Sequence, residues 1–209
     1  MGIAERRARE REQRRRDILA AAWEVAERVG WARFSVEQVA AEAELGRATV
    51  YGYFASQNEL VVAMASEALE QLSVKLAEAP GLSEALDVPV RFAQANPPAF
   101  TLLFPNDESQ HRQFQSAELE RVCAQARDHI ARLTRLAQRS GSKLPKSGSA
   151  SEFLSAVAMA GVLVPELRAS TTLRRRWQDF CLGGQSGAAS SDPASPPPGV
   201  GEPKQPPKK

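Results

Sequence analysis

The chain has 209 residues, of which 43% are apolar, and its formal net charge is +2. This length and apolar content support one large or two modest domains with a real core. No apolar run reaches the roughly 18 residues of a membrane span. No apolar segment follows the arginine-rich N-terminus as it does in a secretory signal. We therefore expect a cytoplasmic protein that does not enter a membrane.

The first 16 residues form an Arg-rich N-terminal arm. They carry seven Arg and three Glu, a net charge of +4 (7 − 3), whereas residues 17–60 carry three Arg and seven acidic residues, a net charge of −4 (3 − 7). Two conformations are open for the arm: a frayed helical extension with Glu and Arg three or four apart, or a disordered segment. A charge run of this kind is most often solvated surface.

An apolar stripe predicts the first helix over Asp17–Val29. Its members recur with helical spacing at Ile18, Ala22, Val25, Ala26 and Val29. Gly30 ends this helix, as glycine commonly does. Trp31 and Phe34, in the connection that follows, are expected to cover the core.

Residues 35–46 predict a short helix and a tight turn. The apolar face of the helix consists of Val36, Val39, Ala40 and Ala43. The Ser35 hydroxyl precedes this face and can accept an N–H of the first turn. The turn ends at Gly46, which we expect to adopt a backbone conformation that other residues resist.

A second short helix is predicted over Arg47–Tyr53, with Val50 and Phe54 buried four residues apart. Its opposite side carries Arg47, Ala48, Thr49, Tyr51 and Tyr53. Basic, hydroxyl and phenol groups on one exposed helix face suit phosphates and base edges. The pattern is that of a helix-turn-helix with Arg47–Tyr53 as the recognition helix.

Two segments carry a family resemblance: ILAAAWEVAERVGWARFSVEQVAAEA, from residue 18, and ATVYGYFASQNEL, from residue 48. Over roughly residues 17–65 they resemble the N-terminal domain of TetR/AcrR-type transcriptional regulators. The positions in register are Gly30, Ser35, Ala40, Thr49, Val50, Tyr51, Tyr53, Phe54, Ser56 and Leu60. Glu44 and Gly46 depart from the Gly and Ser common in the turn, Gln57 replaces a Lys that contacts phosphate, and Gly52 offers no side chain to a base.

The resemblance implies phosphate contacts by Ser35, Thr49, Tyr51 and Tyr53. Arg47 is the candidate for base readout, because a guanidinium can pair with guanine O6 and N7. Three further residues complete the set on the helices. Glu37 is either a reader of cytosine N4 or a solvated surface residue, Gln57 can only hydrogen-bond to a phosphate, and Ala48 shares the exposed face.

The arm is the available source of attraction to DNA phosphates, because residues 17–60 are net acidic. We name Arg14, Arg15 and Arg16 as its candidate DNA contacts. Arginines of such an arm can reach a minor groove, where the narrow shape concentrates negative potential.

A fourth helix is predicted from Ser56 to about Ala79, with Ser56 and Glu59 spaced as a capping box. Pro80-Gly81 ends it. The chain remains helical by pattern to about Leu182, and Pro89 should start, kink or break a helix in that region. The resemblance makes residues 61–182 a regulatory and dimerisation domain. Residues 183–209 are too poor in apolar side chains to form a core, so we expect a disordered tail.

Two sets of residues in residues 61–182 are candidates for a ligand pocket and a dimer interface. The pocket set is Phe92, Phe100, Leu103, Phe104, Phe114 and Val122, for which ordinary core packing is the alternative. The interface set is Phe153, Val157, Ala160, Val164, Trp177 and Phe180, for which packing within one chain is the alternative.

Catalytic and metal chemistry find no support in the sequence. We find no nucleophile elbow, phosphate-binding glycine loop or metal motif. His111 and His129 are too far apart for a helical metal pair, and Cys123 and Cys181 are expected to be reduced structural thiols. We expect no enzyme activity, no metal and no cofactor.

The sequence thus predicts an all-α protein: an N-terminal three-helix helix-turn-helix DNA-binding domain and a C-terminal helical ligand-binding and dimerisation domain. By the resemblance it is a nucleoid-associated repressor that binds a palindromic operator in double-stranded DNA as a homodimer and responds to an apolar or aromatic effector. An activator or an effector-independent regulator are alternatives. A basic membrane-surface or protein-docking module is a rival of another class, disfavoured because Ile3 is the one large apolar residue before Ile18.

Overall fold

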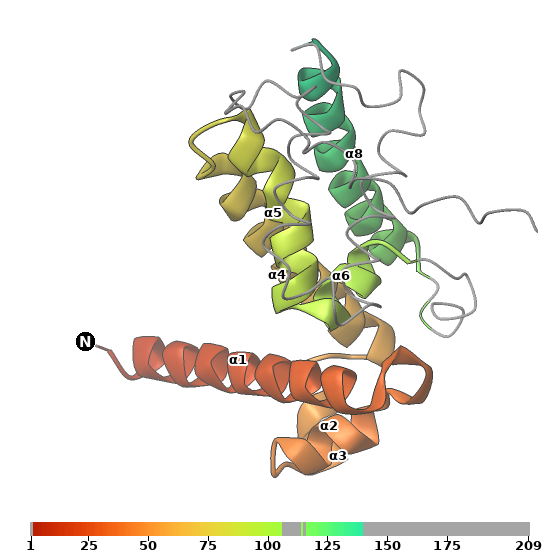
Figure 1. Ribbon diagram of the computed structural model, residues 1–209. Coiled ribbons are helices and arrows are strands. Elements are labelled where there is room, and N and C mark those ends of the chain that lie inside the picture. Colours follow the sequence, from red (N-terminus) through yellow and green to blue (C-terminus); the bar gives the residue numbers. More distant parts are fainter. Residues whose placement is uncertain (1, 106–113, 115, 140–209) are drawn as a thin grey trace, which may run out of the picture.

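The computed structural model describes residues 2–105, 114 and 116–139 (Figure 1). All regular structure in this part of the chain is helical, which confirms the predicted fold class. The elements are α1 (Ile3–Val29), a 3-10 turn η1 (Trp31–Arg33), α2 (Val36–Glu42), α3 (Arg47–Tyr51), α4 (Gln57–Ala77), α5 (Leu82–Ala95), α6 (Pro97–Leu103) and α8 (Ala117–Arg139). The candidate dimer-interface residues, the predicted tail, His111 and Cys181 lie outside the described residues.

The first helix begins much earlier than predicted. α1 starts at Ile3 instead of Asp17, so the arm and the predicted first helix form one continuous helix. Arg, Glu and Gln are good helix formers, and pairs such as Arg6–Glu10, whose atoms lie 3.5 Å apart, add support one turn away. Of the two conformations left open by the sequence, the arm therefore adopts the helical one.

The first three helices enclose a small apolar core. Ile18, Ala22 and Val25 of α1 are fully buried, together with Val39 of α2 and Val50 of α3. α1 ends at Gly30, whose φ of 70° lies in the left-handed region that glycine tolerates. Trp31 and Phe34 follow it and are buried, as predicted.

The turn between α2 and α3 corrects a prediction about glycine. Gly46 has φ −73° and ψ 146°, an ordinary extended conformation. The left-handed residue is instead Glu44, with φ 54°. It stands where the resemblance expects glycine, so the turn has kept its geometry while carrying a residue that disfavours it.

Replacing Glu44 by glycine should therefore stabilise the protein by about 1 kcal/mol, because a residue with a Cβ is strained at positive φ. The measurement is urea unfolding followed by circular dichroism. Glu44→Gln is the matched control, since it removes the same charge and keeps the backbone strain. Equal stabilisation by both variants would assign the effect to charge and contradict the backbone explanation.

The predicted start of the fourth helix is confirmed at Ser56. The Ser56 hydroxyl accepts a hydrogen bond from the Glu59 backbone N–H at 3.1 Å. The returning bond differs slightly from a capping box, because the Glu59 carboxylate accepts from the Ala55 N–H at 2.6 Å. α4 then runs for 21 residues with Leu60, Met64 and Leu72 buried.

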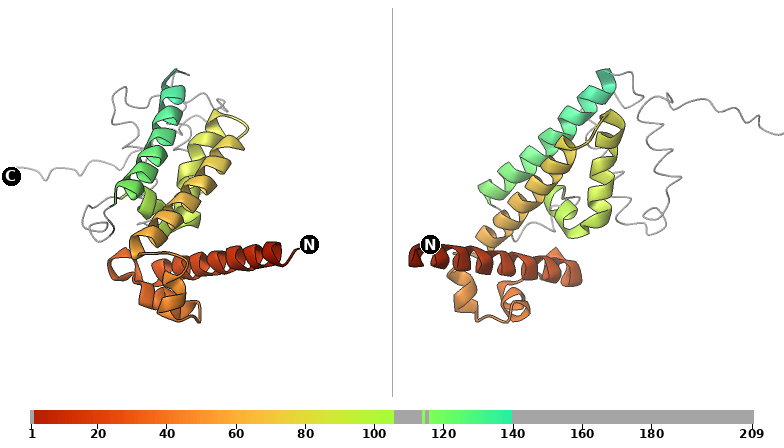
Figure 2. Two further views of the ribbon diagram at one scale, coloured as in Figure 1. Left: turned by 180° about the vertical axis from the view of Figure 1, so that it is seen from behind. Right: turned by 90° about the vertical axis from the view of Figure 1, so that its left-hand side faces the viewer.

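The remaining helices pack around α4. α5, α6 and α8 all contact it, and α1 lies across the end of this group (Figures 1 and 2). α5 continues as one helix through Pro89. Among the described residues, no helix is long and apolar enough to cross a membrane.

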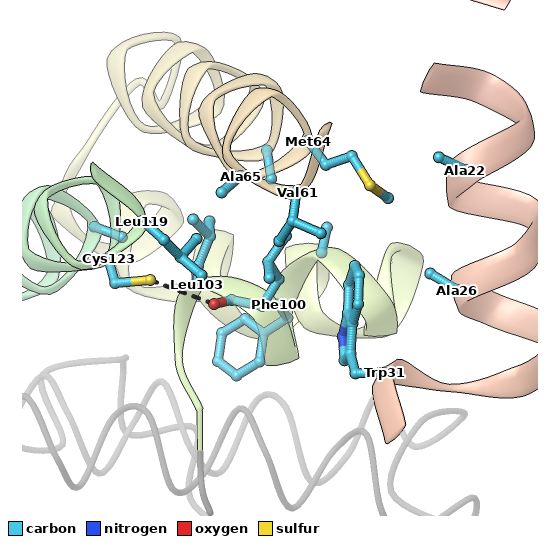
Figure 3. Close-up of a cluster of buried hydrophobic side chains, with 14 of the residues drawn as sticks. Ala22, Ala26, Trp31, Val61, Met64, Ala65, Phe100, Leu103, Leu119 and Cys123 are labelled. Carbon is cyan, nitrogen blue, oxygen red and sulfur yellow. Dashed lines mark hydrogen bonds between the residues drawn. The ribbon is translucent and has the colours of Figure 1, made fainter. Parts of the chain in front are cut away.

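The two parts of the molecule share one core. Figure 3 shows side chains from four helices meeting beside Trp31: Ala22 and Ala26 (α1), Val61, Met64 and Ala65 (α4), Phe100 and Leu103 (α6), and Leu119 and Cys123 (α8). A displacement of α6 or α4 should therefore also shift or strain α1, because closely packed interiors transmit strain.

Candidate nucleic-acid interface

The recognition helix presents a mixed polar surface. α3 buries Val50 and leaves Arg47, Ala48, Thr49 and Tyr51 exposed, with Tyr51 40% accessible. It ends at Tyr51, two residues before the predicted end, because the chain turns at Gly52. Tyr53 is half-buried just beyond this end, and Phe54 enters the core as predicted.

Arg47 and Glu37 form an ion pair across the helix-turn-helix. Nη2 of Arg47 lies 2.7 Å from a Glu37 carboxylate oxygen, and the two side chains are 59% and 51% exposed. The pKa of Glu37 is lowered, mainly by backbone hydrogen bonding at the start of α2, and also by Arg47 and Ser35. The carboxylate is thus charged at neutral pH and pairs with Arg47 on the exposed side of the helix-turn-helix.

Ser35 and Gln57 hold the starts of α2 and α4 in place. The Ser35 hydroxyl accepts from the Gln38 backbone N–H at 3.4 Å, which is the predicted cap. The Gln57 side-chain amide donates to the Phe34 carbonyl at 3.3 Å. Gln57 therefore ties α4 to the residue that precedes the α2 cap.

Arginines of the α1 extension contact the far end of the recognition helix. Nη2 of Arg11 donates to the Gly52 carbonyl at 3.2 Å, and its guanidinium carbon lies 4.9 Å from the centre of the Tyr53 ring. The guanidinium of Arg15 lies 5.0 Å from the centre of the Phe54 ring. A cation at this end is favoured because helix C-termini carry partial negative charge.

The other two predicted arm residues point to neighbours within α1. Arg14 lies 3.9 Å from an Asp17 carboxylate oxygen, and Arg16 donates to the Gln13 side chain at 2.7 Å. Arg11 was missed by sequence reasoning, which favoured the arginines nearest the motif. The signal that identifies Arg11 is its spacing of seven residues before Ile18, which places it on the buried side of α1.

The family model described as bacterial regulatory proteins, tetR family, matches residues 18–64. This span covers the helix-turn-helix and the first part of α4. Residues 18–64 form a TetR-family helix-turn-helix domain. No curated protein sequence is similar enough to match the chain.

Solved structures of TetR-family and related regulators share the fold over 80–83% of this chain. A TetR-like transcriptional regulator from Rhodococcus sp. RHA1 is 21% identical, with a TM-score of 0.60 over 83% of this chain and 96% of that chain. The fatty acid degradation regulator FadR from Bacillus halodurans is 16% identical, with a TM-score of 0.58 over 80% and 97%. FadR from Bacillus subtilis, solved with stearoyl-CoA, is 14% identical, with a TM-score of 0.56 over 80% and 97%.

Beyond the TetR-family domain, the candidate pocket residues divide between a hollow and the core. Phe92 lines a hollow of about 340 Å³ between α4 and α5, together with Lys75, Glu78 and Arg91. Arg91 also pairs with the buried carboxylate of Asp87 one turn earlier. Leu103 is fully buried and Val122 is half-buried.

Three of the candidate phenylalanines make specific ring contacts. Phe100 and Phe104 of the α6 region stack with ring centres 4.8 Å apart. Phe114 instead approaches the TetR-family domain, with its ring centre 6.0 Å from both Trp31 and Phe34. Phe114 is thus placed to join the two parts of the molecule.

The described residues contain no candidate metal site and one buried cysteine. In residues 2–105, 114 and 116–139, no group of three or more His, Cys, Asp or Glu is arranged to hold a metal ion. Cys123 is buried, its Sγ donates to the Leu102 carbonyl at 3.4 Å, and burial raises the pKa of its thiol to about 11. The thiol is therefore protonated at neutral pH, as expected for a structural cysteine.

Proposed function

We propose that the protein is a homodimeric, ligand-responsive transcriptional repressor that binds a palindromic operator in double-stranded DNA. The observation that carries this proposal is the exposed Arg47–Tyr51 surface of α3 in a TetR-family domain that is packed directly onto a helical bundle. Two recognition helices related by a two-fold axis would enter successive major grooves roughly 34–36 Å apart.

In this proposal residues 61–182 regulate and dimerise the chain. An effector bound among these helices would favour one separation of the two recognition helices, and DNA affinity would follow. The phenylalanines at 92, 100, 104 and 114 are the reason to propose an apolar or aromatic effector, and because all four are buried, such an effector must open the core to reach them. The hollow beside Phe92 is lined in part by the charged residues Lys75, Glu78, Glu84 and Arg91. Acyl-CoA esters should be among the compounds tested as effectors, because one structural neighbour was solved with stearoyl-CoA.

The alternatives differ in whether the protein represses or activates transcription and in whether it needs an effector. The same arrangement serves an activator or an effector-independent regulator equally well. The proposal places the protein in the cytoplasm at the nucleoid and gives it no catalytic role. A membrane-surface role is disfavoured because the α1 extension carries Ile3 as its one large apolar residue.

A gel-shift experiment on the full chain tests the proposal. The probe is the DNA upstream of the protein's own gene, with a random duplex of equal length and anionic liposomes as controls. We expect specific binding with Kd in the range of roughly 10⁻⁸ to 10⁻¹¹ M and two protomers per site. Equal affinity for the random duplex, or preference for liposomes, would refute the proposed function.

A further inference from the structure

Three arginines in the first half of α1 lie on the same helix face as the residues that the second half buries. Counting back from Ile18 in helical steps of three or four reaches Arg15, Arg11 and Arg7, which we call the arginine row. Ile18 is buried in the TetR-family domain, and Arg15 and Arg11 contact the end of the recognition helix. Arg7 lies one turn before Arg11 in α1, and the N-terminal part of this helix projects beyond α2 and α3 (Figures 1 and 2).

The helical form of the arm changes how it can meet DNA. An α-helix with side chains is about 10–12 Å wide, whereas the minor groove is only about 6 Å wide. The arm therefore does not lie within a minor groove as an extended segment would. A straight helix can instead lie over the sugar–phosphate backbone, with arginines about 6 Å apart along its axis.

We propose that the arginine row, Arg7, Arg11 and Arg15, is a phosphate-binding surface that contacts the duplex outside the groove entered by α3. This inference rests on the proposed function and adds a second DNA-contacting element to it. Arg11 has two roles. Its bond to Gly52 and its place over the Tyr53 ring orient the end of the recognition helix, and a guanidinium has further N–H groups with which to donate to a phosphate.

The row also accounts for the charge distribution of the TetR-family domain. Residues 17–60 have a net charge of −4 and repel DNA, whereas the arm has +4. Phosphate contacts supply most sequence-independent affinity, and each one releases counterions. A rigid row attached to the recognition helix delivers that charge at a fixed position, so that it also sets the register of α3 on the duplex.

The opposite side of the same helix provides a matched control. Arg6, Arg9 and Arg16 lie on the far side of α1 from the row, and Arg6 and Arg16 pair with Glu10 and Gln13. Arg16, a candidate DNA contact by sequence, is therefore not part of the proposed phosphate-binding surface. Replacing either set of three by glutamine removes the same charge from the same helix. Arg and Gln have similar helix propensities, so both variants should keep α1 helical.

The experiment measures the slope of log K against log salt for the full chain on two duplexes, its upstream operator and a duplex of arbitrary sequence, and each slope is divided by the number of protomers bound, so that the changes below are per protomer. Arg7→Gln/Arg11→Gln/Arg15→Gln should reduce the slope by on the order of 2 to 3 units, at about 0.9 per phosphate contact. Arg6→Gln/Arg9→Gln/Arg16→Gln should change it by less than about one unit. Arg7→Gln alone should reduce it by about 0.9 and leave the melting temperature unchanged, because Arg7 lies beyond the contacts with α3.

Three outcomes would overturn the proposal. Equal losses of slope in the two triple variants would mean that only total charge matters. If the triple variant of the row binds more weakly but keeps the wild-type slope, the row only positions α3 and does not bind phosphates. An unchanged slope in Arg7→Gln would remove the outer contact on which the surface depends. If the wild type binds the operator no more tightly than the arbitrary duplex, the proposed function is wrong. The arginine row is then still tested by the slopes on the arbitrary duplex.

Discussion

Replacing Arg47 by alanine is expected to weaken operator binding by roughly ten- to a hundredfold and to relax discrimination at one guanine, because a bidentate arginine–guanine contact contributes about 1–3 kcal/mol of specificity. Arg47 begins α3 and is more than half exposed, and its Nη2 is paired with the Glu37 carboxylate, so reading a base requires the guanidinium to share or leave that carboxylate. The measurement is competitive binding to the operator and to single-base variants of each half-site.

Two conservative variants separate charge from geometry. Arg47→Lys keeps the charge and loses the planar fork, so it should retain the salt dependence and lose base discrimination. Glu37→Gln should raise non-specific affinity by removing a negative charge near DNA and lower discrimination by releasing the Arg47 side chain. Full discrimination in both variants would show that Arg47 contacts only phosphate.

Features that arise within one turn of helix could be predicted from the sequence. The caps at Ser35 and Ser56, the end of α1 at Gly30 and the burial of Val50 and Phe54 all depend on neighbours a few residues away. Hydrophobic period and cap residues carry such information directly. The helix-turn-helix and its exposed face follow from them.

Contacts between distant residues could not be predicted in this way. The bond from Arg11 to Gly52 spans 41 positions, and that from Trp31 to Thr101 spans 70. The sequence left the conformation of the arm open between helix and disorder, because the exposed first four turns of α1 have no apolar stripe. The left-handed conformation fell on Glu44 instead of Gly46 because Glu44 directly follows the C-cap residue of α2, where the N–H groups of Glu44 and Leu45 donate to the carbonyls of Ala41 and Ala40 in a helix C-cap that needs a left-handed residue.

The junction of the two parts of the molecule is a cluster of aromatic rings around Trp31. Its indole N–H lies within hydrogen-bonding distance of Thr101 Oγ1 at 3.1 Å and the Pro98 carbonyl at 3.3 Å, both in α6. Its ring meets Trp23, Phe34 and Phe114 at centre-to-centre distances of 6.1, 5.4 and 6.0 Å. Trp31 is only 5% exposed, so it joins the TetR-family domain to α6 through buried contacts.

Trp31→Ala is therefore expected to lower the free energy of unfolding by about 3–5 kcal/mol, the usual cost of truncating a large buried aromatic side chain. Trp31→Phe keeps most of the ring and loses the N–H donor to α6, so its cost should be nearer 1 kcal/mol. Urea unfolding at one fixed protein concentration measures both, since oligomer stability depends on concentration. Trp23→Phe is the matched control: this half-buried indole donates to Glu67 of α4 at 3.1 Å, so the variant removes an indole N–H bond and leaves the contacts of Trp31 with α6 in place. If Trp31 joins the two parts, Trp31→Ala should also split unfolding into two transitions, with the DNA-binding helices melting apart from the α4–α8 bundle. A single transition at unchanged urea concentration would contradict that role, because a residue that couples two units cannot be removed without changing their cooperativity.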